Sequence, residues 1–313
     1  FNDAPFHTRL RTLMSAAFTP AATRALTVAI DAASNALLDR LPASEPFDFM
    51  RQFAQILPVR VISDMLGVET ADLDQTKAWS EAISMVVEPV AARGLREHSN
   101  RATIEMTEYL RAELARRRAH PSDTLLDVLI EGQRDDPSLS DDDLLANLML
   151  LFLAGHETSA SALSWALHLL ANAPDVQERL YAEAREHLPG VGADPGKVKD
   201  LVLARNVFRE TLRLFPPVGF LARQSSRPCT MRGKLMPAGA SVVISPWLIH
   251  RHRELWARPD EFDPDRYDGD VDDDLPARES LRRAYLPFGM GPRVCIGAAF
   301  ALQEAALVLS TLV

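Results

Sequence analysis

Cysteine is scarce in this sequence, since Cys229 and Cys295 are the only two among 313 residues. Two cysteines cannot form a disulfide framework, and so small a number suits a reducing compartment, which leads us to expect a cytoplasmic protein. The sequence also lacks metal-finger spacings, a phosphate-binding loop and a Ser-His-Asp signature. These absences argue against a disulfide-stabilised secreted module, a zinc finger, a P-loop nucleoside triphosphatase and a serine hydrolase.

A basic character is missing as well. The chain has 34 lysines and arginines against 43 aspartates and glutamates, a net charge of −9, so we expect no nucleic-acid partner. Its 47% hydrophobic and 25% charged residues are ordinary for a globular protein, and 313 residues suffice for one large core. No internal repeat or clear linker divides the chain, which favours a single domain over residues 1–313.

One long stretch, residues 144–171, is apolar around nearly its whole helical circumference, so it is either buried or membrane-spanning. His156, Glu157, Thr158 and Ser159 interrupt its middle, and ionisable groups are costly in lipid. No second hydrophobic segment accompanies it. We therefore expect a buried central helix and no membrane segment in this chain.

Periodicity and helix punctuation predict a mainly helical chain with a small β-rich section. The sequence favours helices at residues 8–18, 19–38, 52–66, 72–87, 96–118, 123–131, 140–171, 175–187 and 198–214. It favours short extended pieces at residues 47–50, 219–224, 230–232 and 240–245, with a hairpin turn over 232–239. The chain thus divides into a helix-rich part (1–215), a β and coil part (216–297) and a last helix (298–313).

Cys295 stands between a glycine-containing turn and a run of strong helix formers. The segment from Phe288 to Gly297 reads Phe-Gly-Met-Gly-Pro-Arg-Val-Cys-Ile-Gly. At a helix N-terminus the pKa of a thiol can fall from ~8.5 to ~3.5–7.5, so we expect a thiolate at Cys295. A hydrogen-bonded thiolate can be the axial ligand of haem iron, held without covalent attachment because Cys-x-x-Cys-His is absent. The alternative is a structural cysteine packed among glycines.

The polar interruption of the long helix reads Ala-Gly-His-Glu-Thr-Ser over residues 154–159. The hydroxyl of Thr158 can donate to the carbonyl four residues back, that of Ala154, and so bend the helix. Gly155 leaves room beside this distortion for a small molecule, and Glu157 places a proton source beside the hydroxyl. The alternative is a glycine packing contact next to a satisfied polar cluster.

Two further pairs of charged residues share a helix face. Glu210 and Arg213 are spaced i, i+3, and His7 and Arg11 are spaced i, i+4. Neither pair is informative alone, because exposed ion pairs contribute only ~0–1 kcal/mol and are common. Their order is informative: Glu210 and Arg213 are followed by a Phe-Asp-Pro-Asp-Arg-Tyr segment that contains Arg266, and then by the cysteine segment.

In this order the motifs resemble those of the cytochrome P450 superfamily, in the style of its soluble bacterial members. The resemblance implies a mainly α fold of triangular outline with small β-sheets. Haem b would lie between the helix of residues 144–171 and the helix after Cys295. The family's N-terminal sheet and helices and its C-terminal hairpin have no counterpart in this sequence. We therefore expect residues 1–313 to form a single incomplete domain, a fragment of a longer enzyme.

The resemblance also implies roles for individual residues. Glu157 and Thr158 match the acid–alcohol pair that delivers protons for oxygen activation, and Cys295 matches the metal ligand. The matching cofactor-binding positions are His7, Arg11, Ala154, Arg223, Phe288, Gly289, Arg293, Cys295 and Gly297.

Structural positions follow from the same resemblance, and a docking surface is suggested by clustered charge. Glu210, Arg213 and Arg266 match the triad that fixes the chain beneath the haem. An arginine cluster before the cysteine segment, consisting of Arg278, Arg282 and Arg283, is a candidate docking surface for an acidic electron-transfer partner, since complementary charge raises encounter rates. The alternative is an ordinary solvated face.

The implied activity is that of a haem-thiolate monooxygenase, which hydroxylates a small organic substrate with one atom of dioxygen. A ferredoxin or a flavoprotein reductase would supply the electrons. Two alternatives are a peroxide-driven peroxygenase, whose relatives typically lack the acid–alcohol pair, and a non-catalytic haem-binding fragment. Candidate pocket-lining segments are residues 84–90, 148–152 and 218–221.

Overall fold

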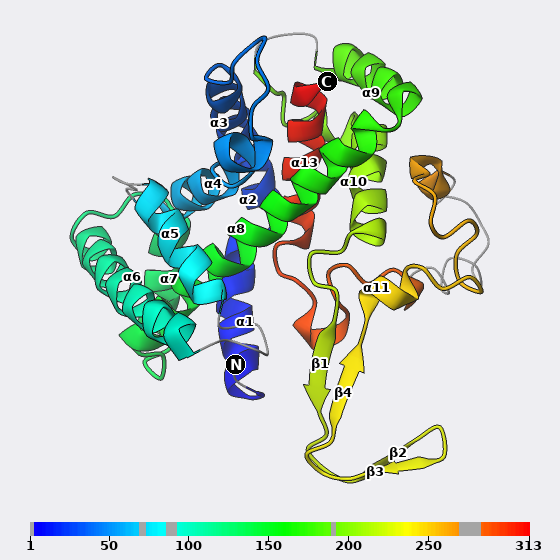
Figure 1. The fold of residues 1–313 in the computed structure, drawn as a ribbon. Coiled ribbons are helices and arrows are strands. Elements are labelled where there is room, and N and C mark those ends of the chain that lie inside the picture. Colours follow the sequence, from blue (N-terminus) through cyan, green and yellow to red (C-terminus); the bar gives the residue numbers. More distant parts are fainter. Residues whose placement is uncertain (1–2, 69–72, 86–92, 189–191, 269–282) are drawn as a thin grey trace.

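The computed structural model describes residues 3–68, 73–85, 93–188, 192–268 and 283–313. Helices dominate it, as the sequence predicts (Figure 1). The α-helices are α1 (Phe6–Ala17), α2 (Pro20–Ala25), α3 (Thr27–Leu38), α4 (Leu57–Leu66), α5 (Leu73–Ser84), α6 (Arg93–Ala119), α7 (Leu125–Asp135), α8 (Asp141–Ala171), α9 (Pro174–His187), α10 (Val202–Leu214), α11 (Pro246–Ile249) and α13 (Ala298–Leu312).

The long helix α8 runs through the middle of the molecule and joins two apolar clusters. It begins with a capping box in which Ser140 and Asp143 satisfy each other's backbone amides. Its first half packs into a cluster with α4 to α7, and its second half packs into a cluster with α3, α10 and α13. The polar residues 154–159 lie between these two halves. The predicted buried central helix is therefore confirmed.

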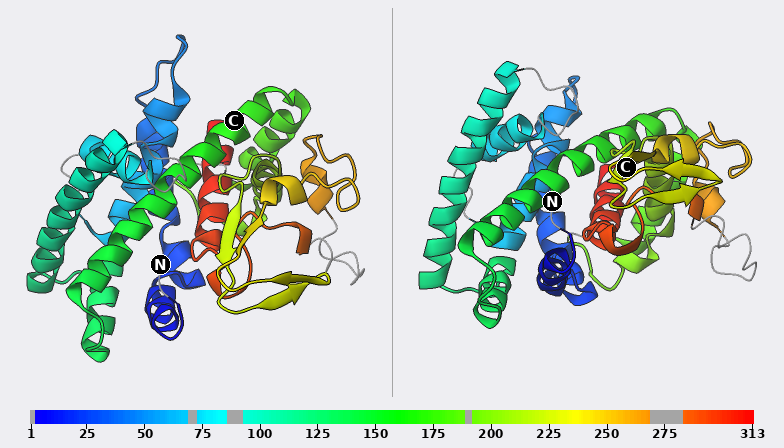
Figure 2. Two further views of the ribbon diagram at one scale, coloured as in Figure 1. Left: turned by 60° about the horizontal axis from the view of Figure 1, so that its bottom comes forward. Right: turned by 90° about the horizontal axis from the view of Figure 1, so that it is seen from below.

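Figures 1 and 2 show how the other elements lie around α8. Helices α5, α6 and α7 form one side, and the strands with α11 and the following coil form the other. Along the described part of the chain, no single helix has the length and hydropathy to cross a membrane. One bent pair, Phe6–Ser15 with Pro20–Leu38, passes that test by length and composition alone.

Two small antiparallel sheets follow α10, as the extended pieces in the sequence predict. Strand β1 (Leu221–Gln224) pairs with β4 (Ser241–Ile244), and β2 (Cys229–Met231) pairs with β3 (Lys234–Met236). The β2–β3 turn places Arg232 and Gly233 at positive φ, which explains the glycine of the predicted hairpin. Cys229 is exposed on this hairpin.

The strand predicted at residues 47–50 is wrong. Phe49 leads into a π-helix, η1 (Met50–Ala54), and its ring stacks on Phe53 at 5.1 Å between centroids. This i, i+4 contact requires a helical backbone, and the buried Phe53 draws the segment into the core. The helix predicted over residues 19–38 is divided at Leu26 into α2 and α3, although Thr19 caps its start as expected.

Candidate functional site

The segment before α13 is a tight loop that presents Cys295 just ahead of the helix. Gly289 and Gly291 have φ of 71° and 76°, where a side chain would strain the backbone. The amide of Cys295 donates to the carbonyl of Phe288 at 2.9 Å, which closes the loop. Helix α13 begins three residues later, with Gly297 as its N-cap. The predicted position of Cys295 at a helix N-terminus is confirmed.

The expected low pKa of Cys295 is wrong for the protein chain alone. Burial of the sulfur by the surrounding loop raises its pKa, although the residue reaches the surface. The Gly297 amide and the charge of Arg11 act in the opposite direction. Desolvation exceeds these two contributions, so the chain by itself favours the thiol.

Two arginines and a histidine from the two ends of the chain meet beside this loop. Arg11 Nη1 on α1 donates to the carbonyl of Val294 at 2.8 Å. Arg293 Nη2 donates to Asp3 Oδ1 at 2.7 Å. Burial lowers the pKa of His7, and the charges of Arg293 and Arg11 lower it further, which places the three side chains within electrostatic reach. The surroundings of His7 therefore favour an anion.

Arg223 forms a different kind of contact. It lies on the exposed strand β1, and its Nη1 donates to the carbonyl of its neighbour Ala222 at 2.8 Å. Its participation in the cation group therefore stays a prediction.

The polar break of α8 has the local geometry that the sequence predicts. Thr158 Oγ1 donates to the Ala154 carbonyl at 2.7 Å. Ala154 and Glu157 are exposed, whereas His156 is fully buried. Gly155 does not leave room for a small molecule, because a Cβ there would lie 2.5 Å from Ile62 Cδ1. This glycine serves the close packing of α4 on α8, which was the alternative interpretation.

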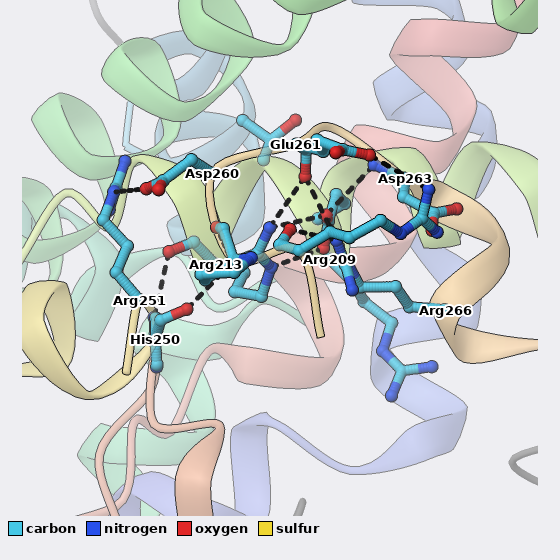
Figure 3. A network of polar contacts seen from close by, with 12 residues as sticks. Arg209, Arg213, His250, Arg251, Asp260, Glu261, Asp263 and Arg266 are labelled. Atoms are coloured by element: carbon cyan, nitrogen blue, oxygen red, sulfur yellow. Dashed lines mark hydrogen bonds and ion pairs between the residues drawn. The ribbon is translucent and has the colours of Figure 1, made fainter. Parts of the chain in front are cut away.

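Glu210, Arg213 and Arg266 form one buried network, as predicted (Figure 3). Arg213 donates to both oxygens of Glu210 at 2.8 Å, and the two side chains are fully buried. Arg266 Nε reaches Glu210 Oε1 at 2.9 Å. Arg213 also donates to the carbonyls of Pro259 and Glu261, at 2.6 and 3.0 Å. The network thus fixes the coil after α11 onto α10.

Several residues of this network were missed in the sequence. The hydroxyl of Tyr267 donates to Glu210 at 3.2 Å, and Arg209 covers the Tyr267 ring at 4.0 Å. His250, which no sequence motif singles out, is fully buried and bonded at both ring nitrogens. The position of Tyr267 next to Arg266 was a usable signal. No local pattern marks His250, because its partners lie 36 and 37 residues away.

The remaining predicted positions are only partly described. Arg278 and Arg282 lie outside the described residues, whereas Arg283 is exposed. Of the candidate lining segments, residues 86–90 lie outside the described part. Leu148 and Phe152 are buried, and Val218 and Phe220 are exposed.

The residues around Cys295 fit a haem group. The sulfur accepts a backbone hydrogen bond from Gly297, which is how a thiolate ligand is stabilised. His7, Arg11 and Arg293 supply donors for carboxylate groups next to the loop. Val294 and Met290 expose apolar surface there, at 37% and 53%. A soft ligand, a cationic edge and an apolar surface are the requirements of this cofactor.

Comparison with known proteins gives two relatives from one Streptomyces species that are similar to this chain in sequence. Cyclooctatin synthase of Streptomyces melanosporofaciens is 40% identical over 192 residues, which cover 60% of this chain and 40% of that protein. Cyclooctat-9-en-7-ol 5-monooxygenase of the same organism is 30% identical over 261 residues, covering 79% and 56%. The chain thus spans about half the length of these relatives.

A solved structure confirms the fold. P450BioI, in complex with acyl carrier protein ligated to hexadec-9Z-enoic acid, matches with a TM-score of 0.83 and 26% identity, covering 100% of this chain and 73% of that one. The family model described as Cytochrome P450 matches residues 1–313. Motif order, helical architecture and family model agree, and the chain belongs to the cytochrome P450 family.

Proposed function

We propose that this protein is a haem-thiolate monooxygenase, which inserts one atom of dioxygen into a small organic substrate with electrons from a redox partner. The observation that carries the proposal is the presentation of Cys295 ahead of α13 by a loop that Gly289 and Gly291 shape. Family membership supplies the cofactor, since cytochromes P450 bind haem b. One relative is itself named a monooxygenase.

In this proposal the sulfur of Cys295 would hold the haem iron. Bound haem supplies the activation of dioxygen, which no protein side chain can provide. Because the chain alone favours the thiol, Cys295 would release a proton to solvent when it holds the group, and the Gly297 amide would stabilise the charge on its sulfur. Ala154, Phe288 and Gly289 form the contact surface for the macrocycle.

The propionates of haem would be held by His7, Arg11 and Arg293. These side chains already lie within electrostatic reach of one another beside the loop. Arg223 is assigned to the same group on the family resemblance. Charge-assisted hydrogen bonds from guanidinium groups to carboxylates are among the stronger ones in proteins.

Thr158 and Glu157 would move protons. The Thr158 hydroxyl gives its hydrogen to the Ala154 carbonyl, so its oxygen is oriented to accept a hydrogen bond from a neighbouring donor. The exposed carboxyl of Glu157 can collect protons from solvent at the adjacent position. A peroxide-driven enzyme has less need of such a pair, so these residues favour the oxygen-dependent reaction.

Glu210, Arg213 and Arg266 would have a structural role. Their buried network fixes the coil that leads to the cysteine loop, and none of the three is assigned to substrate or dioxygen. Loss of one partner would leave a buried charge uncompensated, so we expect cofactor binding to fail together with folding.

The partners follow from the same reaction. A ferredoxin or a flavoprotein reductase would deliver electrons, and the arginine cluster at Arg278, Arg282 and Arg283 would dock it by complementary charge. The scarcity of cysteine favours a cytoplasmic location. Charge reversal of the three arginines should slow reduction in a salt-dependent way, and unchanged reduction kinetics would refute the docking surface.

The test is spectroscopic and then kinetic. The haem-loaded protein is reduced and exposed to carbon monoxide, and a thiolate ligand gives a strongly red-shifted Soret band. Cys295→Ser is the matched control and should lose that band. Turnover is then compared between a reductase system with dioxygen and peroxide alone. Haem uptake without turnover in either assay supports a non-catalytic haem-binding fragment, and faster turnover with peroxide supports the peroxygenase.

A further inference from the structure

His250 occupies a fully buried position between α10 and the segment that precedes the cysteine loop. It follows α11 directly and has no exposed surface. Its Nδ1 lies 3.2 Å from the carbonyl of Arg213, at the end of α10. Its Nε2 lies 2.8 Å from the amide nitrogen of Leu286. One side chain therefore connects two segments that are 73 residues apart (286 − 213).

The two partners determine the tautomer of the ring. A carbonyl only accepts and an amide N–H only donates, so Nδ1 must carry the hydrogen and Nε2 must be bare. A second proton on Nε2 would point at the N–H of Leu286. Burial, together with the charges of Arg213 and Arg251, lowers the pKa of His250 to about 4, although the backbone hydrogen bond to Arg213 raises it. His250 is therefore a neutral hydrogen-bond bridge at physiological pH.

The environment of the ring keeps it in place. Tyr285 stacks on it at 5.5 Å and an interplanar angle of 26°, and Trp256 meets it edge-on at 6.3 Å. Burial raises the pKa of the Tyr285 hydroxyl, which donates to the Arg209 carbonyl at 2.9 Å. Arg213 and Arg251 are thus the charged groups that face His250, and Tyr285 is a neutral titratable neighbour.

The hydrogen bonds continue from His250 to Cys295. The carbonyl of Leu286 accepts from the amide of Gly289 at 3.1 Å, and the carbonyl of Phe288 accepts from the amide of Cys295 at 2.9 Å. In return, Arg213 Nη1 donates to the His250 carbonyl at 2.8 Å. The start of the cysteine loop is therefore attached, through this ring, to the Glu210–Arg213 network. Figure 3 shows His250 beside Arg213.

We propose that His250 is a positioning residue for the axial ligand, because its bond to the Leu286 amide fixes the start of the loop that carries Cys295. This inference rests on the proposed role of Cys295 and goes beyond it. If the bond is lost, the amide of the half-buried Leu286 has no acceptor, and the loop can relax by moving. Haem would then remain bound while the sulfur ligand is lost from part of the molecules.

Two substitutions separate the two ring nitrogens. His250→Asn keeps an amide donor near the position of Nδ1 and removes the acceptor for Leu286. His250→Gln is longer and can place its carbonyl oxygen near the position of Nε2, which restores that acceptor. His252→Asn, two residues away on the exposed surface, is the control. The readout is the fraction of total haem that gives the red-shifted carbon monoxide band, together with the free energy of unfolding.

We expect the ratio of thiolate-ligated to other haem to fall roughly tenfold in His250→Asn, because the Leu286 amide loses its acceptor. His250→Gln should recover most of that loss, and His252→Asn should match the unmodified protein. A loss of stability alone could also lower this ratio. As a reference, we measure the ratio in the unmodified protein at the urea concentration that gives it the same free energy of unfolding as each variant.

The inference is overturned if His250→Asn keeps the full thiolate fraction, or if both variants lose it only as much as the urea-matched reference. It is also overturned if His250→Asn does not fold and His250→Gln does not recover the thiolate-ligated fraction. If the unmodified protein gives no red-shifted band, the proposed function fails instead.

Discussion

Arg266 Nε lies 2.9 Å from Oε1 of Glu210, the same oxygen that receives a hydrogen bond from Arg213. Two guanidinium groups therefore form ion pairs with one fully buried carboxylate. The backbone amide of Asp263 donates to that oxygen as well, at 3.1 Å. The carboxylate thus joins a helix to a coil 56 residues further along the chain.

Glu210→Gln should lower the free energy of unfolding by ~3–5 kcal/mol, since the change leaves two buried arginines without their counter-charge. Asp265→Asn is a matched control because it breaks the ion pair with Arg179, whose two side chains are each 47% exposed. That change should cost only ~0–1 kcal/mol. Urea unfolding followed by circular dichroism measures both, and equal losses would contradict the structural role.

Arg11→Gln should weaken the hold on haem about tenfold, because a charge-assisted hydrogen bond to a propionate is worth ~1.5–3 kcal/mol. The variant also loses the bond to Val294 that steadies the cysteine loop. Arg9→Gln is the control on the same helix, since Arg9 pairs with Ser138 and Asp136 near α7. Transfer of haem to apomyoglobin gives the dissociation rate. Identical rates of haem dissociation in the two variants would show that Arg11 does not bind haem.

Thr158→Ala should reduce product formed per reductant by roughly tenfold or more, since a hydroxyl in the proton path is lost. The missing reducing equivalents should appear as hydrogen peroxide. Thr158→Ser keeps a hydroxyl and should remain coupled. Thr311→Ala is a further control, because Thr311 Oγ1 makes the same bond to a carbonyl four residues back, at 2.8 Å. Undiminished coupling in Thr158→Ala would exclude the relay.

Glu304 on α13 is fully buried, and burial raises its pKa from 4.5 to about 8, against a hydrogen bond with Ser159 that lowers it. The folded protein keeps a proton that the unfolded chain releases. The stability from that proton is complete below pH 4.5 and is lost as the pH rises to about 8.

The side chain introduced by Glu304→Gln stays neutral at every pH. The free energy of unfolding of this variant should therefore equal that of the unmodified protein near pH 5 and exceed it near pH 8. The gain should approach several kcal/mol, at about 1.4 kcal/mol per pKa unit. Unfolding in guanidinium at the two pH values provides the measurement, with Glu97→Gln on the exposed face of α6 as control. If the two proteins differ in free energy of unfolding by the same amount at both pH values, Glu304 is charged in the folded state.

Features that depend on neighbours in the sequence were predictable. The caps at Thr19 and Ser140, the bond from Thr158 to Ala154 and the place of Cys295 before α13 all follow from residues within four positions of each other. The buried network was predictable only through the family resemblance, because an i, i+3 pair such as Glu210 and Arg213 is equally common on surfaces.

Features that depend on distant contacts were not predictable. Gly155 meets Ile62 of α4, and His250 bonds Leu286, and neither contact leaves a local pattern. The pKa of Cys295 was predicted with the wrong sign because helix position is visible in a sequence whereas desolvation is not. Phe49 and Phe53 likewise fold into a helix because of the core that they enter.

The bond between Arg11 and the Val294 carbonyl spans 283 positions of the chain. A ribosome adds ~5–20 residues per second, so the segment around Arg11 emerges on the order of tens of seconds before its partner. During that interval the early helix lacks the contact that will orient its cations. A porphyrin whose binding depends on both segments can therefore be captured only after residue 294 has been synthesised.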